Sequence, residues 1–338
     1  MARPLRAAGG LGAAARSLLW LGVALSSACR PHADREGEPA TDARSGAHEG
    51  HVVGSGGIRL FYRVLGTGPD TIVAVHGGPG VDMNTIVPGY APLAERHVLI
   101  FYDQRGGGRS TLPADTTLLE ARHFVEDLEA VRRHFGLGRM NILAHSFGPV
   151  LVALYAQTYP EHVGRMIFTG AIAPSRALSR QYVRATYESL DSAARARQAA
   201  LIDSVETAAD PVPFCLALED RDSLPAPGTE GTMCSAPPDA IRYGMRYTRR
   251  ITFGSLGDWD FTNSLDDVTA ALLVIHGEHD PSGLESARAW AAAVPNGRVL
   301  IVPGAGHGPH GERPDLVFPA IDAFLSGRWP ENAKEISE

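Results

Sequence analysis

The sequence predicts an α/β protein in which helices cover both faces of a mostly parallel sheet. Short apolar runs rich in β-branched residues alternate with segments of helical periodicity, and most of these runs lack the apolar–polar alternation of a half-exposed strand. The composition is globular, with 44% hydrophobic and 20% charged residues in a chain of 338. A net charge of −7 argues against a nucleic-acid partner, because phosphate binding needs clustered Lys and Arg.

The apolar runs and the periodic segments define the elements in chain order. Strands are expected where apolar and β-branched residues run together, at residues 58–64, 71–75, 98–102, 141–144, 166–168, 271–275 and 299–302. Helices are expected where apolar residues recur every three or four positions, at residues 124–135, 150–159, 286–294 and 315–325. Gly136 and Pro160 end the first two helices.

These elements divide the chain into a core and an insertion. Residues 52–173 and 264–330 are predicted to form the α/β core. Residues 174–263 interrupt the pattern and are predicted to form a cap, helical at first and then rich in loops. We expect the cap above the carboxyl ends of the strands, where open α/β sheets bind their ligands.

The first 28 residues have the pattern of a secretory signal peptide. Three arginines precede a short apolar stretch at residues 17–25, and small residues follow. The stretch is too short for a stable membrane anchor, and a buried N-terminal helix is the alternative. Leu25-Ser-Ser-Ala-Cys29 resembles a bacterial lipoprotein box, although Ser26 stands where Leu is usual. We therefore expect export from a bacterial cell, either as a lipoprotein acylated on Cys29, periplasmic or attached to the membrane, or as a soluble secreted protein.

The sequence after the predicted signal peptide gives two further expectations. Residues 29–51 are polar and lack periodicity, which predicts a flexible tether. If Cys29 is acylated or removed, Cys215 and Cys234 remain, and a disulfide between them is predicted. Two unpaired buried thiols are the alternative.

Ser146 is the candidate nucleophile. It lies between a predicted strand and a predicted helix, in A-H-S-F-G, with small residues two positions before and after it. This is the pattern of a nucleophile elbow, although Ala144 replaces the usual glycine. A serine that caps the following helix is the alternative.

A serine hydroxyl needs a base, and the base needs an orienting acid. Asp280 and His307 each follow a predicted strand, and the order Ser, Asp, His is the usual one for such an elbow. His310 competes with His307 as the base, whereas His276 and His279 are expected to be structural or solvated.

The oxygen that becomes negative in acyl transfer needs hydrogen-bond donors. His76-Gly77-Gly78-Pro79-Gly80 follows a strand, and Pro79 has no N–H, so Gly78 is the expected donor. The amide of Phe147 at the start of a helix is the second, and a simple tight turn at residues 76–80 is the alternative. The histidines lack metal-ligand spacing, so neither a metal nor another cofactor is expected.

With these motifs, the chain resembles α/β-hydrolases of the prolyl aminopeptidase (proline iminopeptidase) family over about residues 52–328. The resemblance rests on H-G-G-P-G at 76–80, D-Q-R-G-G-G-R-S at 103–110, A-H-S-F-G at 144–148, G-x-L-x-x-W-D at 254–260, H-G-E-H-D at 276–280 and G-A-G-H at 304–307. It implies the α/β-hydrolase fold, with a triad of Ser146, Asp280 and His307 and an oxyanion hole of Gly78 and Phe147. It also implies that Asp103 and Arg105 brace the loops under the site.

One departure concerns substrate specificity. Peptidases of this family bind the free amine of the substrate with acidic residues, and Pro281 and Arg249 occupy two of the expected positions. Acids of the cap that are available instead are Glu188, Glu206, Glu219 and Asp220. The sequence thus predicts a serine hydrolase that forms an acyl-enzyme and releases N-terminal residues, preferably proline, from small peptides. A carboxylesterase or amidase acting on small acyl substrates is the alternative, and a non-catalytic binding protein is the alternative of another class.

Overall fold

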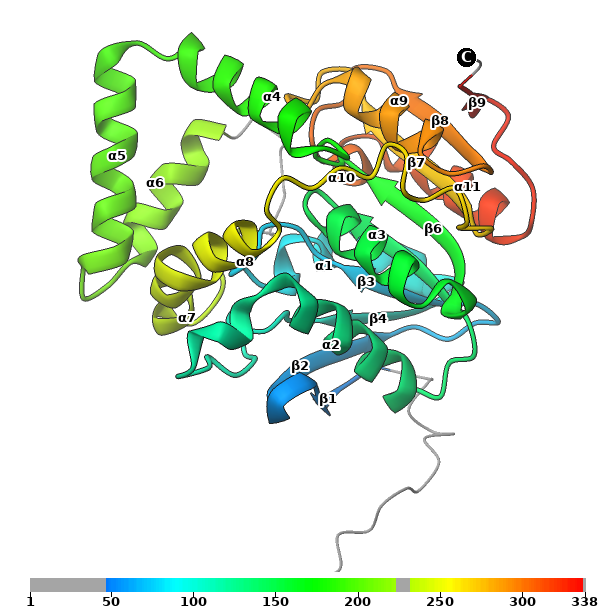
Figure 1. Cartoon of the computed structure of the whole chain (residues 1–338), viewed down its shortest axis with the longest axis horizontal. Coiled ribbons are helices and arrows are strands. Elements are labelled where there is room, and N and C mark those ends of the chain that lie inside the picture. The colour runs from blue at the N-terminus through cyan, green and yellow to red at the C-terminus, as the bar shows by residue number, and fades with distance from the viewer. Residues whose placement is uncertain (1–46, 223–231, 337–338) are drawn as a thin grey trace, which may run out of the picture. The chain divides into compact units, whose positions relative to one another are not determined.

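The computed structural model describes residues 47–222 and 232–336, without the side chains of residues 220–222. The predicted signal peptide, Cys29 and most of the predicted tether lie outside the described residues. A nine-stranded sheet in the order β1-β2-β4-β3-β5-β6-β7-β8-β9 runs through the described part of the chain (Figure 1). Its strands are β1 (His48–Val53), β2 (Arg59–Leu65), β3 (Thr71–Val75), β4 (Val98–Tyr102), β5 (Met140–His145), β6 (Val163–Thr169), β7 (Ala271–Gly277), β8 (Gly297–Val302) and β9 (Lys334–Glu335).

The pairing confirms the predicted fold class. Strands β3 to β8 are parallel to one another, whereas β1 and β2 at one edge and β9 at the other are added by antiparallel pairing. The predicted tether extended too far along the chain, because residues 48–51 belong to strand β1. This strand pairs with β2 from His48 opposite Val64 to Val53 opposite Arg59. In β1 only Val52 is buried, so this edge strand has almost no apolar periodicity by which to recognise it.

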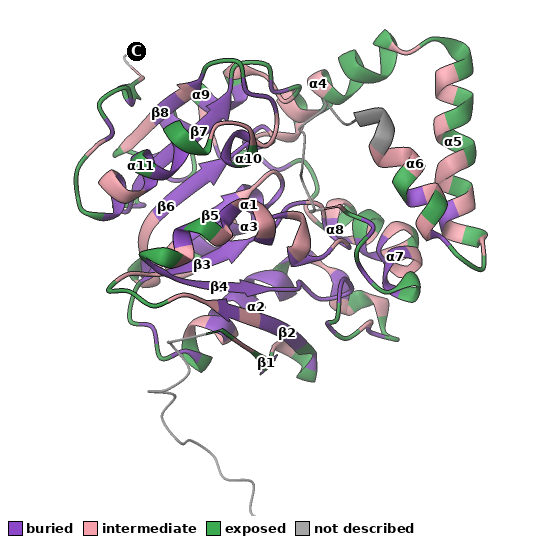
Figure 2. Cartoon of the chain, turned by 180° about the vertical axis from the view of Figure 1, so that it is seen from behind, coloured by how far each residue is buried: buried purple, intermediate pink, exposed green. Residues whose placement is uncertain are grey.

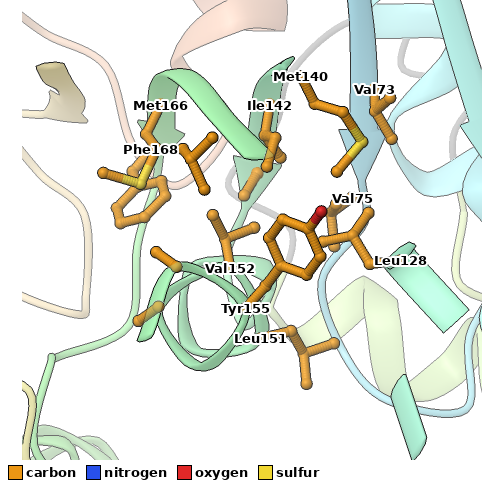
Figure 3. Close-up of a cluster of buried hydrophobic side chains, with 14 of the residues drawn as sticks. Val73, Val75, Leu128, Met140, Ile142, Leu151, Val152, Tyr155, Met166 and Phe168 are labelled. Carbon is orange, nitrogen blue, oxygen red and sulfur yellow. The ribbon is translucent and has the colours of Figure 1, made fainter. Parts of the chain in front are cut away.

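Two layers of helices cover the sheet, because successive strand residues point to opposite faces. On one face, Val73 and Val75 of β3 pack in a cluster with α2 (Ala121–His134), α3 (Gly148–Thr158) and α9 (Leu284–Ala292). On the other, Ile72 and Ala74 pack with α1 (Val87–Tyr90) and α11 (Pro314–Leu325). Figure 3 shows part of the first cluster, including Val73, Val75, Leu128, Met140, Ile142, Leu151, Val152, Tyr155, Met166 and Phe168. This double packing makes the central strands rigid supports for the loops at their ends.

The remaining short helix on the core is α10 (Pro309–Glu312), and brief helical turns connect other elements. These turns are η1 (Ser55–Gly57), η2 (Met83–Thr85), η3 (Ala91–Glu95), η4 (Thr116–Leu119) and η5 (Pro160–His162). In the described residues, no helix is long and apolar enough to span a membrane.

Between β6 and β7 the chain forms a group of helices on one side of the sheet (Figure 1). They are α4 (Arg176–Ser189), α5 (Ser192–Thr207), α6 (Val212–Asp222), α7 (Pro238–Tyr243), the π-helical η6 (Gly244–Thr248) and α8 (Arg249–Ser255). The expected loop-rich second half is wrong from residue 238 onwards, where helix resumes. Figure 2 shows that α4 and α5 consist almost wholly of exposed and intermediate residues, in contrast to the buried strands.

The cap helices have a small core of their own and direct contacts with the sheet loops. Cys215 and Cys234 are joined by a disulfide, with an Sγ–Sγ distance of 2.07 Å, and both are buried in this core. Thr248 donates a hydrogen bond to the carbonyl oxygen of Gly106 at 2.8 Å. Gly244 packs so closely on Gly80 that a Cβ on Gly80 would lie 2.6 Å from the Gly244 Cα. The π-helix thus rests directly on the glycine-rich loop after β3.

Candidate active site

Ser146 lies in the turn between β5 and α3, in a conformation that side chains rarely adopt. Its φ is 58°, and among the described residues it is the only non-glycine with a positive φ. Hydrogen bonds from Ser146 N–H to Thr169 O (3.0 Å) and from Ile172 N–H to Ser146 O (2.9 Å) hold this turn. A Cβ on Gly148 would approach Val75 O to 2.6 Å, whereas the methyl group of Ala144 is accommodated in the buried core. Position 148 therefore requires glycine, whereas position 144 accommodates alanine.

His307 and Asp280 complete a hydrogen-bonded chain with Ser146. His307 Nε2 is 3.0 Å from Ser146 Oγ, and His307 Nδ1 is 3.1 Å and 3.0 Å from Asp280 Oδ1 and Oδ2. An ionised carboxylate only accepts, so Nδ1 carries the proton and Nε2 is free to accept from the serine hydroxyl. The loops that follow β5, β7 and β8 bring these three residues together.

The charges around Asp280 favour an ionised acid and a basic imidazole. Asp280 is buried, and its Oδ1 accepts from Ser282 N–H (2.8 Å) and Ser282 Oγ–H (2.6 Å). Burial alone would raise the pKa of Asp280, but the hydrogen bond and charge of His307 hold it below its usual value. Burial would lower the pKa of His307, but the hydrogen bond and charge of Asp280 raise it above 6.5.

In the described residues, no other histidine near the site forms a hydrogen bond with Ser146 Oγ. His310, the predicted competitor, is buried and stacks on Tyr90 at 4.1 Å between ring centroids, and burial lowers its pKa to about 3. His145 packs its ring 5.0 Å from that of His307 and places Nδ1 3.0 Å from Thr169 O. His276 is buried with its Nε2 3.6 Å from Asp280 Oδ2. The sequence did not predict this packing of His145 and His310 around His307.

The glycine-rich loop after β3 lies against Ser146. A Cβ on Gly77 would be 2.5 Å from Ser146 Cβ. Gln104, in the loop after β4, donates its N–H to His76 Nε2 (3.1 Å), so His76 Nδ1 carries the proton and donates to Gly77 O (2.7 Å). Burial lowers the pKa of His76 to about 4, which keeps this neutral form. The predicted donors, the N–H groups of Gly78 and Phe147, make no hydrogen bond to another described residue.

Comparison with known proteins agrees with this architecture. A family model described as alpha/beta hydrolase fold matches residues 70–314. The chain belongs to this family. Among curated proteins, a proline iminopeptidase of Heyndrickxia coagulans is 28% identical and covers 82% of this chain and 98% of its own length. A proline iminopeptidase of Saccharolobus solfataricus is 25% identical, covering 80% and 89%.

Solved structures of other proteins share this fold. The proline iminopeptidase of Mycobacterium smegmatis superposes with a TM-score of 0.62 at 25% identity, covering 83% of this chain and 98% of its own. A thermophilic esterase from Thermogutta terrifontis, at 20% identity and a TM-score of 0.59, shares the fold. The predicted resemblance to proline iminopeptidases is thereby confirmed.

In this α/β hydrolase, Asp103 and Arg105 form hydrogen bonds with the backbone of neighbouring segments. Asp103 accepts from Met83 N–H (2.8 Å) and Arg109 N–H (2.7 Å), and burial raises its pKa to about 6. Arg105 is buried in an ion pair with Asp127, with an N–O distance of 2.5 Å. No group of three or more potential metal ligands is close enough to bind an ion in the described residues.

The candidate amine-binding acids of the cap differ in their surroundings. Glu188 pairs with Arg184 at 2.6 Å, and Glu206 pairs with Arg250 at 3.3 Å. Glu219 accepts from the amide of Met233, and burial, with a contribution from the charge of Asp82, raises its pKa. The side chain of Asp220 lies outside the described part of the protein.

Asp82 lies on the loop after β3, just beyond the H-G-G-P-G segment, and it is buried. It accepts from Ser235 Oγ–H, at 3.0 Å and 2.9 Å to its two oxygens. Of the three candidate glutamates, Glu219 alone pairs with no arginine whose side chain the structure describes, and it is close enough to Asp82 for the charge of Asp82 to raise its pKa.

Proposed function

We propose that this α/β hydrolase is a serine hydrolase that forms an acyl-enzyme on Ser146 and releases N-terminal residues, preferably proline, from small peptides. The observation that carries the proposal is the chain of hydrogen bonds from Ser146 Oγ through both nitrogens of His307 to Asp280. A serine in a strained turn, paired in this way and flanked by free amide donors, is the arrangement that acyl transfer requires.

In the proposed first half-reaction, Ser146 Oγ attacks the carbonyl carbon of the substrate while its proton moves to His307 Nε2. Asp280 remains ionised and stabilises the imidazolium. The carbonyl oxygen becomes negative between the N–H groups of Gly78 and Phe147. The C–N or C–O bond then breaks, and the leaving group takes the proton from Nε2. In the second half-reaction a water molecule gives its proton to the same nitrogen and hydrolyses the acyl-serine.

The preference for a free N-terminus is supported by the relatives, which are named proline iminopeptidases. An ammonium group that leaves water needs a carboxylate partner. We assign this role to Glu219 together with Asp82, because Glu219 is partly buried, Asp82 is fully buried, and Asp82 lies on the loop that carries the Gly78 donor.

Carboxylester hydrolysis is the second candidate function. Pro281 and Arg249 stand where acidic residues are expected, and Glu188 and Glu206 are neutralised by arginines. If Glu219 does not bind an amine, the same triad would act on small esters or amides without regard to a free N-terminus.

A matched pair of substrates and a matched pair of variants distinguish the two functions. We would compare kcat/KM for a prolyl-anilide, its N-acetyl form and a short-chain aryl ester. Aminopeptidase activity predicts at least about a tenfold preference for the free amine, equivalent to about 1.4 kcal/mol. That preference should be lost in Glu219→Gln and kept in Glu188→Gln, an exposed control. Equal rates for free and blocked anilides, with faster ester hydrolysis, would favour the esterase.

We also propose that the protein is exported from a bacterial cell. Support comes from the signal-like residues 1–28 and from the Cys215–Cys234 disulfide, a bond typical of oxidising compartments. Mass spectrometry of the mature protein should find an N-terminus at or near Cys29, acylated if it is a lipoprotein. A mature chain that keeps residues 1–28 would contradict export by this route.

A further inference from the structure

A carboxylate outside the triad holds the loop that carries His307. Glu312 ends α10, and its Oε2 accepts from Gly306 N–H at 2.7 Å while its Oε1 accepts from Gly308 N–H at 3.0 Å. The two oxygens of one side chain therefore bind the amides on both sides of His307. Hydrogen bonds to a charged acceptor are stronger than neutral ones, so this contact restrains the backbone of the base.

The loop needs such a restraint because of its composition. It reads Gly304-Ala-Gly-His-Gly308, and glycines have more backbone freedom than any other residue. The loop packs closely against two glycines that follow strands of the sheet or end them. A Cβ on Gly277 would overlap the carbonyl oxygen of Gly306, and a Cβ on Gly170 would overlap the carbonyl oxygen of His307. The sheet thus limits the loop from one side, and Glu312 holds it through its amides.

Glu312 also adds negative charge near the imidazole. The titratable groups that face His307 are Asp280, Glu312, His145 and His310, with His276 behind Asp280. Burial is the largest influence on the pKa of His307, and it lowers this pKa because it disfavours the cation. The hydrogen bond and charge of Asp280 and the smaller effect of the charge of Glu312 raise it. Burial lowers the pKa values of the flanking His145 and His310, and a charged His307 lowers them further, so both rings are neutral beside it.

We propose that Glu312 is a positioning residue, which fixes the His307 loop and places a second negative charge beside the imidazolium formed during acyl transfer. The inference rests on the proposed function, since it assigns Glu312 an effect on the base of that mechanism. Glu312 does not touch the reacting atoms and acts through His307.

Three variants separate charge from geometry. Glu312→Gln removes the charge and one of the two acceptors, whereas Glu312→Asp keeps the charge and shortens the side chain. Glu278→Gln is the matched control, because Glu278 also accepts a hydrogen bond from this loop, at Gly304 N–H (2.9 Å), three residues from His307. For each variant we would measure kcat and KM for an aryl ester across the pH range and follow folding by thermal unfolding.

In Glu312→Gln, kcat at its plateau should fall about tenfold, because the base is less well placed. The acid limb of the pH profile should also move to lower pH by about 0.5 unit, since a negative charge that favours the imidazolium is gone. KM should change little. Glu312→Asp should lower kcat but keep the acid limb of the wild type, and Glu278→Gln should keep both.

A wild-type kcat and acid limb in Glu312→Gln would overturn the proposal, and so would a lower kcat without any shift of the limb. If Glu312→Gln does not fold, Glu312→Asp decides: a wild-type kcat in that variant would overturn the proposal. Failure of the proposed function would give a different result from failure of this inference, because His307→Ala or Ser146→Ala would then keep normal turnover.

Discussion

Replacing Gly77 by alanine would place a methyl group against the candidate nucleophile. The new Cβ would lie 2.5 Å from Ser146 Cβ and 3.1 Å from both Ser146 Oγ and His145 O. Because carbon atoms in contact are normally about 3.5–4.0 Å apart, the loop and the nucleophile must separate by about 1 Å. A displacement of about 1 Å from productive geometry costs roughly 10²-fold in rate, so kcat/KM should fall by about that factor.

The assay compares kcat/KM for an aryl ester and an aminoacyl-anilide in Gly77→Ala and in a control glycine variant. Gly138→Ala is the control, because no atom lies within 4 Å of the added Cβ and its φ, like that of Gly77, is outside the left-handed region. Thermal unfolding of both variants would check that each one folds. If kcat/KM of Gly77→Ala stays within about threefold of the wild-type value, the inferred contact between the glycine-rich loop after β3 and Ser146 is incorrect.

Two further predictions concern the base and the cap. Because His307 must be neutral to accept a proton, and because Asp280 raises its pKa, kcat/KM should fall with decreasing pH around a midpoint above 6.5. Asp280→Asn should lower kcat by roughly 10⁴-fold, and an active Asp280→Asn enzyme with the same pH profile would contradict this role of the acid. Reduction of the Cys215–Cys234 disulfide should lower the free energy of unfolding by about 3 kcal/mol in a urea titration, and an unchanged midpoint would show that the bond adds no stability.

The parts of the fold and site that are encoded locally could be predicted from the sequence. Strands β3 and β4 have the expected bounds, because each is an uninterrupted apolar run buried on both faces. The turn at Ser146 could be recognised because its backbone leaves room only for small residues at positions 144 and 148. Asp280 and His307 were placed together by a topological rule, since the carboxyl ends of neighbouring parallel strands share one edge.

Features that depend on packing between distant segments could not be predicted. Strand β1 is an exposed edge with one buried residue, so it carries no apolar pattern. Glu312 is an ordinary charged residue in sequence, and its role depends on how α10 turns back onto the His307 loop. The later cap helices were missed because Pro, Gly and polar residues around position 230 suggested continuing loops, whereas Ala240 and Ile241 pack with the disulfide in a separate small core.

Ser146 is proposed as the nucleophile of an acyl-transfer site, and intact-protein mass spectrometry with a fluorophosphonate tests this role most directly. The wild type should gain one adduct per chain, peptide mapping should place it on Ser146, and labelling should slow strongly in His307→Ala. Ser146→Ala should remain unlabelled, keep the wild-type unfolding midpoint and lose turnover by several orders of magnitude. Labelling of another residue, or normal turnover in Ser146→Ala, would contradict the claim.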